Sequence, residues 1–136
     1  MAKNEESVKN SAFGFGVLNP YEKYFTGKSY LHGLVEGNGA KAHVAQVTFA
    51  PGTINHWHSH NLPQILIGTG GEGWVQKEGT EPIKMTEGTV VVIEADTRHW
   101  HGAARDSWFS HLSIIVGDED TNWQEPVDQA FYESLR

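Results

Sequence analysis

The sequence HWHSH at residues 56–60 carries the strongest signal in this chain. Side chains two residues apart on a β-strand point to the same face, so we expect His58 and His60 to face one common space. Two protonated imidazoles would repel each other there, whereas two neutral imidazoles are good ligands for a divalent metal ion. The alternative is that these histidines lie on the surface or are satisfied by hydrogen bonds in the core.

A second pair of histidines, His99 and His101, stands in the sequence RHWHG at residues 98–102. A β-barrel can bring this strand beside the first and so supply a third imidazole. Between the two pairs, Gln64 follows a turn at residues 61–63, and a hairpin of that length can return its amide oxygen to the same site. Two strand-borne pairs in one small domain favour a metal site over a surface or tag-like cluster.

The central region, from His43 to Val116, consists of short β-branched or aromatic runs separated by turn residues. The expected strands lie within residues 43–49, 54–60, 64–69, 73–78, 82–86, 89–94, 98–102 and 107–116. Short strands at regular spacing predict an all-β sandwich or barrel. No stretch of this region sustains the apolar period of a helix, which argues against a βαβ fold.

The two ends of the chain differ from the central region. Residues 1–12 are polar and are expected to form a mobile arm, and the aromatic segment 19–25 is expected to lie over the barrel. Apolar residues recur at helical spacing from Val127 to Leu135, with Pro126 at a plausible first helical position. We therefore expect an N-terminal arm over residues 1–25, a barrel over 26–118, and a C-terminal loop with a short helix over 119–136.

Length and composition exclude several classes of protein. A chain of 136 residues fits one domain with a hydrophobic core. The net charge of −7 argues against binding to nucleic acid or to an anionic membrane. The absence of cysteine excludes disulfides, thiolate zinc sites and cysteine nucleophiles. The charged N-terminal sequence lacks the apolar segment of a secretory signal, and no apolar run is long enough to cross a bilayer, so we expect a cytoplasmic protein.

One glycine-rich segment resembles a nucleotide-binding motif but is interpreted differently. The sequence GTGGEG at residues 68–73 fits the pattern of a dinucleotide-binding loop. Such a loop needs a helix directly after it, so that the helix N-terminus faces the pyrophosphate. The sequence that follows alternates like a strand, and we expect a hairpin turn there.

The histidine pairs stand within two motifs that resemble those of the cupin family. The first runs Gly52, five residues, His58-x-His60, three residues, Gln64 and a later Gly71; the second runs Gly88, five residues, Glu94-x-Asp96, two residues and His99. Glu94 and Asp96 stand where Pro and Gly are usual, which concerns the loop shape and not the ligands. Gln64 replaces the usual metal-binding Glu. The resemblance implies a jelly-roll barrel, the double-stranded β-helix.

The glutamine, with QILIGTGGEGWVQKEG (64–79), RHWHGAARDSWFSHLSI (98–114) and NWQEPV (122–127), is similar to one group of small bacterial cupins, the manganese-dependent hydroxynitrile lyases. The resemblance covers about residues 20–132. It implies that the metal ligands are His58, His60, Gln64 and His99, and that His101 and His111 face the substrate. It also implies one divalent metal ion per chain, manganese first, with iron, nickel, cobalt or zinc as alternatives, and a homodimer.

The amide of Gln64 changes the charge of the expected site. A carboxylate would cancel one unit of the charge of the metal, whereas an amide oxygen cancels none. Such a centre is expected to bind its metal less tightly and to act as a stronger Lewis acid. The alternative is that Gln64 only forms a hydrogen bond at the end of a strand.

The other histidines have weaker signals. His111 lies in the apolar sequence SWFSHLSII, where it is expected to share a face with Phe109 and Ser113 and either contacts the substrate or is a satisfied core residue. His101 shares a face with His99 but is expected too far along the strand to bind the metal. We expect His56 to lie at the rim of the cavity or in solvent. His32 and His43 stand outside the cluster, and we expect no special role for them.

The sequence therefore predicts a metal-binding barrel whose apolar cavity takes a small organic substrate. The resemblance implies a lyase in which the metal is a Lewis acid and His111, with His101, transfers the proton as a cyanohydrin yields a carbonyl compound and cyanide. An iron-dependent dioxygenase and a zinc hydration enzyme are alternatives with the same ligands. A barrel that only binds a small ligand is the alternative outside the enzymes.

Overall fold

The computed structural model describes residues 2–36, 39 and 41–136. Residue 1 of the expected arm and residues 37, 38 and 40 of the expected barrel lie outside the described residues. The elements, in chain order, are α1 (Glu5–Lys9), β1 (Val17–Leu18), the short 3-10 helix η1 (Glu22–Tyr24), β2 (Ser29–Glu36), β3 (Ala42–Phe49), β4 (His58–His60), β5 (Gln64–Gly71), β6 (Gly73–Lys77), β7 (Ile83–Met85), β8 (Val90–Ile93), β9 (His99–Ala103), β10 (Phe109–Val116), β11 (Thr121–Trp123) and α2 (Gln129–Glu133).

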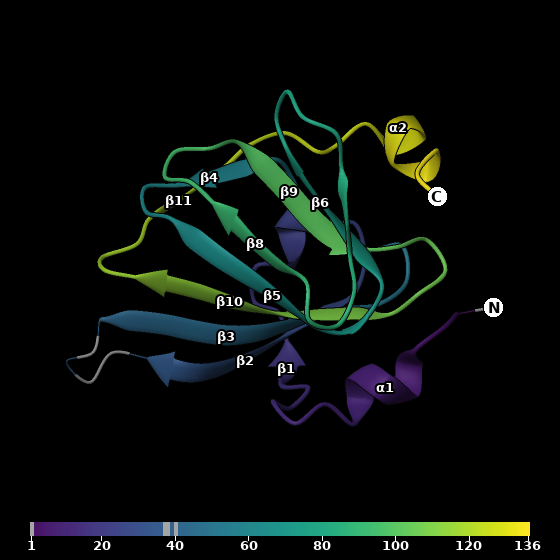
Figure 1. The fold of residues 1–136 in the computed structure, drawn as a ribbon, viewed down its shortest axis with the longest axis horizontal. Coiled ribbons are helices and arrows are strands. Elements are labelled where there is room, and N and C mark those ends of the chain that lie inside the picture. Colours follow the sequence, from purple (N-terminus) through teal and green to yellow (C-terminus); the bar gives the residue numbers. More distant parts are fainter. Residues whose placement is uncertain (1, 37–38, 40) are drawn as a thin grey trace.

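The strands form two antiparallel sheets around a common interior (Figure 1). The larger sheet has the strand order β1-β2-β3-β10-β5-β8, and the smaller has the order β11-β4-β9-β6-β7. Both the all-β class and the short C-terminal helix predicted from the sequence are confirmed. The order also shows that strands distant in sequence are neighbours, because β4 pairs with β9 and β10 lies between β3 and β5.

The main core fills the space between the two sheets. Its buried residues are Val47, Phe49, Leu66, Val75, Met85, Val91, Ile93, Ala103 and Phe109. On β5, buried and half-buried residues alternate, since Leu66 and Gln64 point inward and the residues between them do not. A one-residue shift of register would turn this whole face outward, so burial of Leu66 also fixes Gln64 toward the interior.

Two turns predicted as hairpins instead cross from one sheet to the other. Residues 61–63 connect β4 of the smaller sheet to β5 of the larger, and Glu72 connects β5 to β6. Gly71 has a φ of +73°, and a Cβ atom there would lie 1.8 Å from the carbonyl oxygen of Trp108, so the second crossing requires glycine. The hairpin prediction failed because turn length alone does not reveal which sheet the next strand joins. No helix follows this glycine-rich segment, as predicted.

The expected strand at residues 54–60 is confined to β4 at its C-terminal end. The backbone before β4 pairs elsewhere, since Ile54 forms an isolated bridge with Gly102 and the amide of His56 donates to the carbonyl of Tyr24. The strand therefore begins at His58. Because His56 precedes the strand, the alternation of side chains along β4 does not place it on the same face as His58.

The first residues are not the free arm that their polarity predicts. Helix α1 lies beside β5, and its residue Val8 is completely buried. The backbone amide of Lys3 donates to the carbonyl of Asp106 over 2.6 Å, which fixes the start of the chain. A single valine in a mostly polar segment gives too weak a pattern to predict this packing. The boundaries of the three expected segments stay predictions.

Near the C-terminus, helix α2 begins at Gln129, three residues after the position expected from Pro126. Asp128 is the N-cap, and its side chain accepts a hydrogen bond from the amide of Ala130. Pro126 therefore precedes the cap and is not the first helical residue. Within the described residues, no helix has the length and apolar character needed to cross a membrane.

Candidate functional site

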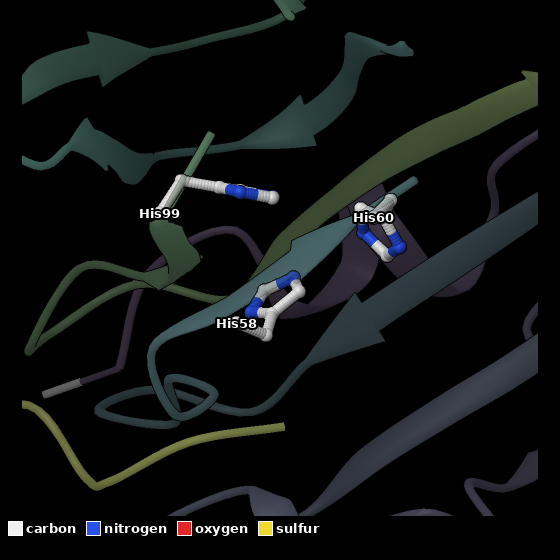
Figure 2. A group of neighbouring side chains, drawn as sticks. All are labelled: His58, His60 and His99. Atoms are coloured by element: carbon white, nitrogen blue, oxygen red, sulfur yellow. The ribbon is translucent and has the colours of Figure 1, made fainter. Parts of the chain in front are cut away.

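Three histidines from two neighbouring strands meet at one end of the interior, and we call them the histidine trio. His58 and His60 stand two residues apart on β4, and His58 pairs directly with His99 of β9. Their possible ligand nitrogens all lie within 4.8 Å of one another. Figure 2 shows the three rings, two from one strand and one from the other. This group can hold a metal ion, as the spacing of the two histidine pairs predicted.

Hydrogen bonds orient each ring of the trio in the same way. Nδ1 of His58 lies 2.8 Å from the carbonyl oxygen of His56. Nδ1 of His60 lies 2.7 Å from Oε1 of Glu119, and Nδ1 of His99 lies 2.9 Å from the carbonyl oxygen of Thr97. These oxygens only accept, so in the neutral rings Nδ1 carries the hydrogen and Nε2 keeps its lone pair. Buried Nε2 of His60 has no hydrogen-bond partner among the described residues. A buried nitrogen without a partner is costly, and a metal ion would satisfy it.

Burial keeps two rings of the trio, His58 and His99, in the form that binds metal. His58 and His99 are almost wholly buried. Loss of hydration, with His99 and His60 nearby, holds the pKa of His58 well below its usual value. Burial likewise lowers the pKa of His99 to about 4. Both rings are therefore neutral at pH 7, and no proton has to leave them before a metal binds.

Gln64 adds an oxygen to the trio from the opposite sheet. Its Nε2 donates to Oγ of Ser113 over 2.8 Å, and its Oε1 lies 3.1 Å from Nε2 of His99. With the hydrogen of His99 on Nδ1, two acceptor atoms face each other across this distance. Such a contact is repulsive unless a cation interacts with both atoms or the amide turns so that its NH₂ group faces His99. The hairpin that was expected to bring Gln64 here does not exist, yet the two sheets enclose the same interior and place it beside His99.

A second group of side chains forms a continuous hydrogen-bonded chain beside the trio. His111 Nδ1 lies 3.1 Å from the carbonyl oxygen of Leu112, and His111 Nε2 lies 3.0 Å from Nδ1 of His101. Nε2 of His101 lies 3.2 Å from Nδ2 of Asn55, whose Oδ1 accepts from the backbone amide of His101. One set of hydrogens satisfies every contact: Asn55 donates to His101, His101 donates to His111, and His111 donates to Leu112. We call this the Asn55–His101–His111 chain.

Both rings of the Asn55–His101–His111 chain are buried and neutral. Burial lowers the pKa of His111 to about 4, although its contact with the carbonyl of Leu112 acts in the opposite direction. Burial and the neighbouring His111 hold the pKa of His101 well below its usual value. Both rings are therefore uncharged at neutral pH, and either could accept a proton released by a reaction in the cavity.

A cavity of about 290 Å³ opens onto both groups. Its walls include both sheets, and the segment before β2, which was expected to lie over the barrel, contributes Phe25. The apolar wall residues are Phe25, Leu31, Val35, Val44, Val47, Ile115 and Trp123. His101, His111 and Ser113 face the same space, so the strand parity predicted for β10 is correct. A small organic molecule with one polar group fits this combination of apolar walls and clustered histidines.

Comparison with known proteins agrees with this geometry. The family profile described as a cupin domain matches residues 45–115. This chain belongs to the cupin family. A protein named (R)-mandelonitrile lyase, from Granulicella tundricola, is 40% identical over 90 residues, which are 65% of this chain and 69% of that protein.

Solved structures support the same fold. A cupin-like protein from Thermotoga maritima is 34% identical and superposes with a TM-score of 0.84, covering 92% of this chain and 96% of that one. A DMSP lyase, DddQ from Ruegeria pomeroyi DSS-3, is 19% identical with a TM-score of 0.64, covering 93% of this chain and 63% of that one. The second likeness is one of fold alone.

Two polar residues of this cupin site were not identified from the sequence. Asn55 lies before β4 and is fully buried, but its sequence surroundings do not distinguish it from other turn asparagines. Glu119 belongs to an acidic loop in which three carboxylates follow each other, and only the pairing of β11 with β4 shows which one faces His60. The acidic loop was the available signal, and it was interpreted only as a connection.

The remaining histidines lie outside these contacts. His56 is half-buried and its Nδ1 lies 3.1 Å from the carbonyl oxygen of Gln124. His32 is exposed and contacts the carbonyl of Phe13. His43 borders the outer part of the cavity, where Nε2 lies 3.0 Å from the carbonyl oxygen of Gly117. None of the three joins the trio or the Asn55–His101–His111 chain.

Proposed function

We propose that this cupin is a metal-dependent lyase that cleaves a small cyanohydrin into a carbonyl compound and cyanide. The observation that carries this proposal is the cavity itself, which is apolar along its walls and has both the histidine trio and the neutral His101–His111 pair at its polar end. The relative named (R)-mandelonitrile lyase supports the choice of reaction.

His58, His60, His99 and Gln64 are the residues that would hold the metal ion, and we propose manganese. Nε2 of His60, which has no hydrogen-bond partner in the described part of the chain, and the facing atoms of Gln64 and His99 fit a divalent cation. When bound, the ion supplies Lewis-acid polarisation of the substrate oxygen.

The Asn55–His101–His111 chain can transfer the proton that the reaction requires. Nε2 is the nitrogen of His101 that carries a lone pair, so we propose that the amide of Asn55 gives up its contact and that this nitrogen accepts the proton of the substrate hydroxyl. His111 keeps accepting the Nδ1 hydrogen of His101 and so stabilises the positively charged ring. The carbon–carbon bond then breaks, its electron pair leaves with cyanide, the carbonyl double bond forms, and cyanide takes the proton back from His101.

The walls of the cavity orient the substrate and exclude water. Phe25, Leu31 and Trp123 offer apolar surface to the organic group, while the polar end lies at the histidines. Trp123 packs with its ring centroid 4.7 Å from that of His58, so the apolar wall begins directly beside the trio. A substrate held this way presents its hydroxyl to the histidines and its apolar group to the walls.

The test is metal-dependent release of benzaldehyde from mandelonitrile. Protein purified without a nickel column is stripped with a chelator, reloaded with Mn²⁺, and assayed by the absorbance of benzaldehyde. We expect release well above the metal-free control, and the same release by His32→Ala, which changes an exposed histidine away from the site. No release above the control removes this reaction, and substrate-dependent oxygen uptake by iron-loaded protein would favour a dioxygenase in its place. The homodimer and the cytoplasmic location stay predictions.

A further inference from the structure

The loop between β10 and β11 places one carboxylate against the histidine trio. The loop contains Asp118, Glu119 and Asp120, of which Asp118 and Asp120 are exposed and Glu119 is half-buried. Oε1 of Glu119 lies 2.7 Å from Nδ1 of His60, and the hydroxyl of Thr121 donates to the same oxygen. His60 is the trio member whose Nε2 has no partner among the described residues. Glu119 therefore holds the ring that offers its lone pair to the site.

Hydrogen bonds of the Asn61 side chain and the pairing of β11 with β4 fix the loop that carries Glu119. Asn61, which directly follows His60, donates from its side chain to the carbonyl of Asp118 over 3.0 Å and accepts from the amide of Asp120 over 2.7 Å. Strand β11 then pairs with β4, so that Thr121 stands opposite His60. Contacts on both sides of Glu119 thus hold its side chain toward His60, and its exposed fraction is 23%.

The ligand set of the proposed site lacks negative charge. Imidazole and amide ligands carry no charge when they bind a metal, so none of these four side chains would compensate the charge of a divalent ion. A carboxylate that accepts the Nδ1 hydrogen of a metal-binding imidazole makes the ring more basic and brings a full negative charge close to the ion. In this site the only carboxylate contacting a trio ring, among the described residues, is Glu119.

We propose that Glu119, acting through His60, supplies the negative charge that Gln64 does not, and thereby sets the metal affinity of the site. Glu119 is a positioning residue, because it contacts the ligand and not the metal or substrate. This inference rests on the metal site of the proposed function, but not on the reaction assigned to it. It predicts that removing the charge of Glu119 lowers the metal affinity, and that a carboxylate at position 64 partly restores it.

The experiment compares the affinity of variants for Mn²⁺ alone. Full-length protein stripped of metal is titrated with Mn²⁺, and free ion is followed by electron paramagnetic resonance. Glu119→Gln retains an oxygen that can accept from His60 but removes the charge, and we expect its Kd to rise about 10- to 100-fold. Asp120→Asn makes the same change of net charge on an exposed residue of the same loop, and its Kd should stay within about twofold.

A double variant tests whether the lost affinity reflects the missing negative charge or a changed orientation of His60. Adding Gln64→Glu to Glu119→Gln should recover at least about tenfold of the lost affinity, because the carboxylate then contacts the ion directly. Thermal unfolding of the metal-free variants shows that each is folded. Wild-type affinity in Glu119→Gln, or no recovery in the double variant, overturns the inference. Failure of the wild-type protein to bind Mn²⁺ would instead overturn the proposed metal site.

Discussion

The two groups of buried histidines beside the cavity differ in how their ring nitrogens are satisfied. In the Asn55–His101–His111 chain, every ring nitrogen has a partner within 3.2 Å. In the histidine trio, each Nδ1 has a partner, while Nε2 of His60 has none in the part of the chain that the structure describes and Nε2 of His99 faces the oxygen of Gln64. The first group has all its hydrogen-bond partners, and the second keeps nitrogens that a cation could bind.

This difference shows that burial alone does not assign a role to a histidine. Burial holds the pKa of His58 and of His101 well below the usual value in the same way. The roles proposed for them differ because a ring nitrogen of His58 lies within 4.8 Å of ring nitrogens of His60 and His99, whereas both ring nitrogens of His101 contact Asn55 and His111. The hydrogen-bond partners therefore distinguish the proposed metal ligands from the proposed proton carriers, whereas burial does not.

The largest effect should follow from breaking the trio. His99→Ala removes the ligand contributed by β9, and we expect metal affinity to fall by more than about 100-fold and lyase activity to be lost. Elemental analysis of the purified variant and titration with Mn²⁺ measure the first effect, and benzaldehyde release the second. The assignment of the trio would be wrong if His99→Ala retained stoichiometric metal with wild-type affinity.

A change in the other group should remove activity without removing metal. His111→Gln can still accept the hydrogen of His101 Nδ1 but cannot stabilise a charged ring in the same way, so kcat should fall by about 10²- to 10⁴-fold. The metal content of the same preparation should equal that of the wild type. Joint loss of metal and activity would show that the two groups are not separate.

Acid should destabilise the protein through the buried histidines. An unfolded His111 takes up a proton near pH 6.5, whereas the folded residue does so only near its pKa of about 4. The unfolded state therefore binds more protons in this window, and the free energy of unfolding falls as the pH falls from about 6.5 to about 4. His111→Gln should make this dependence shallower by about 1.4 kcal/mol per pH unit in the metal-free protein. Urea unfolding at several pH values measures the slope, and an unchanged slope would show that His111 is already protonated when folded.

Much of the fold and half of the site follow from short-range sequence patterns. Alternation along β5 and β8 predicts which side chains face the core, and the spacing of His58 and His60 predicts that their rings converge. The partnership of His58 with His99 needed one further assumption, that a barrel brings distant strands together, and the pairing of β4 with β9 confirms it.

The failures concern information that no local pattern contains. The turn at residues 61–63 was expected to form a hairpin, because its sequence does not state that β5 joins the other sheet. Glu119 and its two acidic neighbours are equivalent in the sequence, and long-range pairing with β4 selects one of them. Asn55 is assigned by hydrogen bonds to a residue 46 positions away. Such choices depend on tertiary contacts between segments far apart in the chain.

The smallest of these effects should come from Asn55→Asp. This variant tests the direction of hydrogen-bond donation in the Asn55–His101–His111 chain. The carboxylate can still accept from the backbone amide of His101, but it cannot donate to Nε2, so the hydrogen of the ring should move from Nδ1 to Nε2. We expect kcat to fall by about tenfold with metal content unchanged. The ¹⁵N chemical shifts of His101 report the tautomer directly, and Asn122→Asp makes the same chemical change at an exposed position of β11. A lower kcat with the tautomer of His101 unaltered would mean that Asn55 acts on the cavity by another route, and the direction of donation along the chain would have to be reversed.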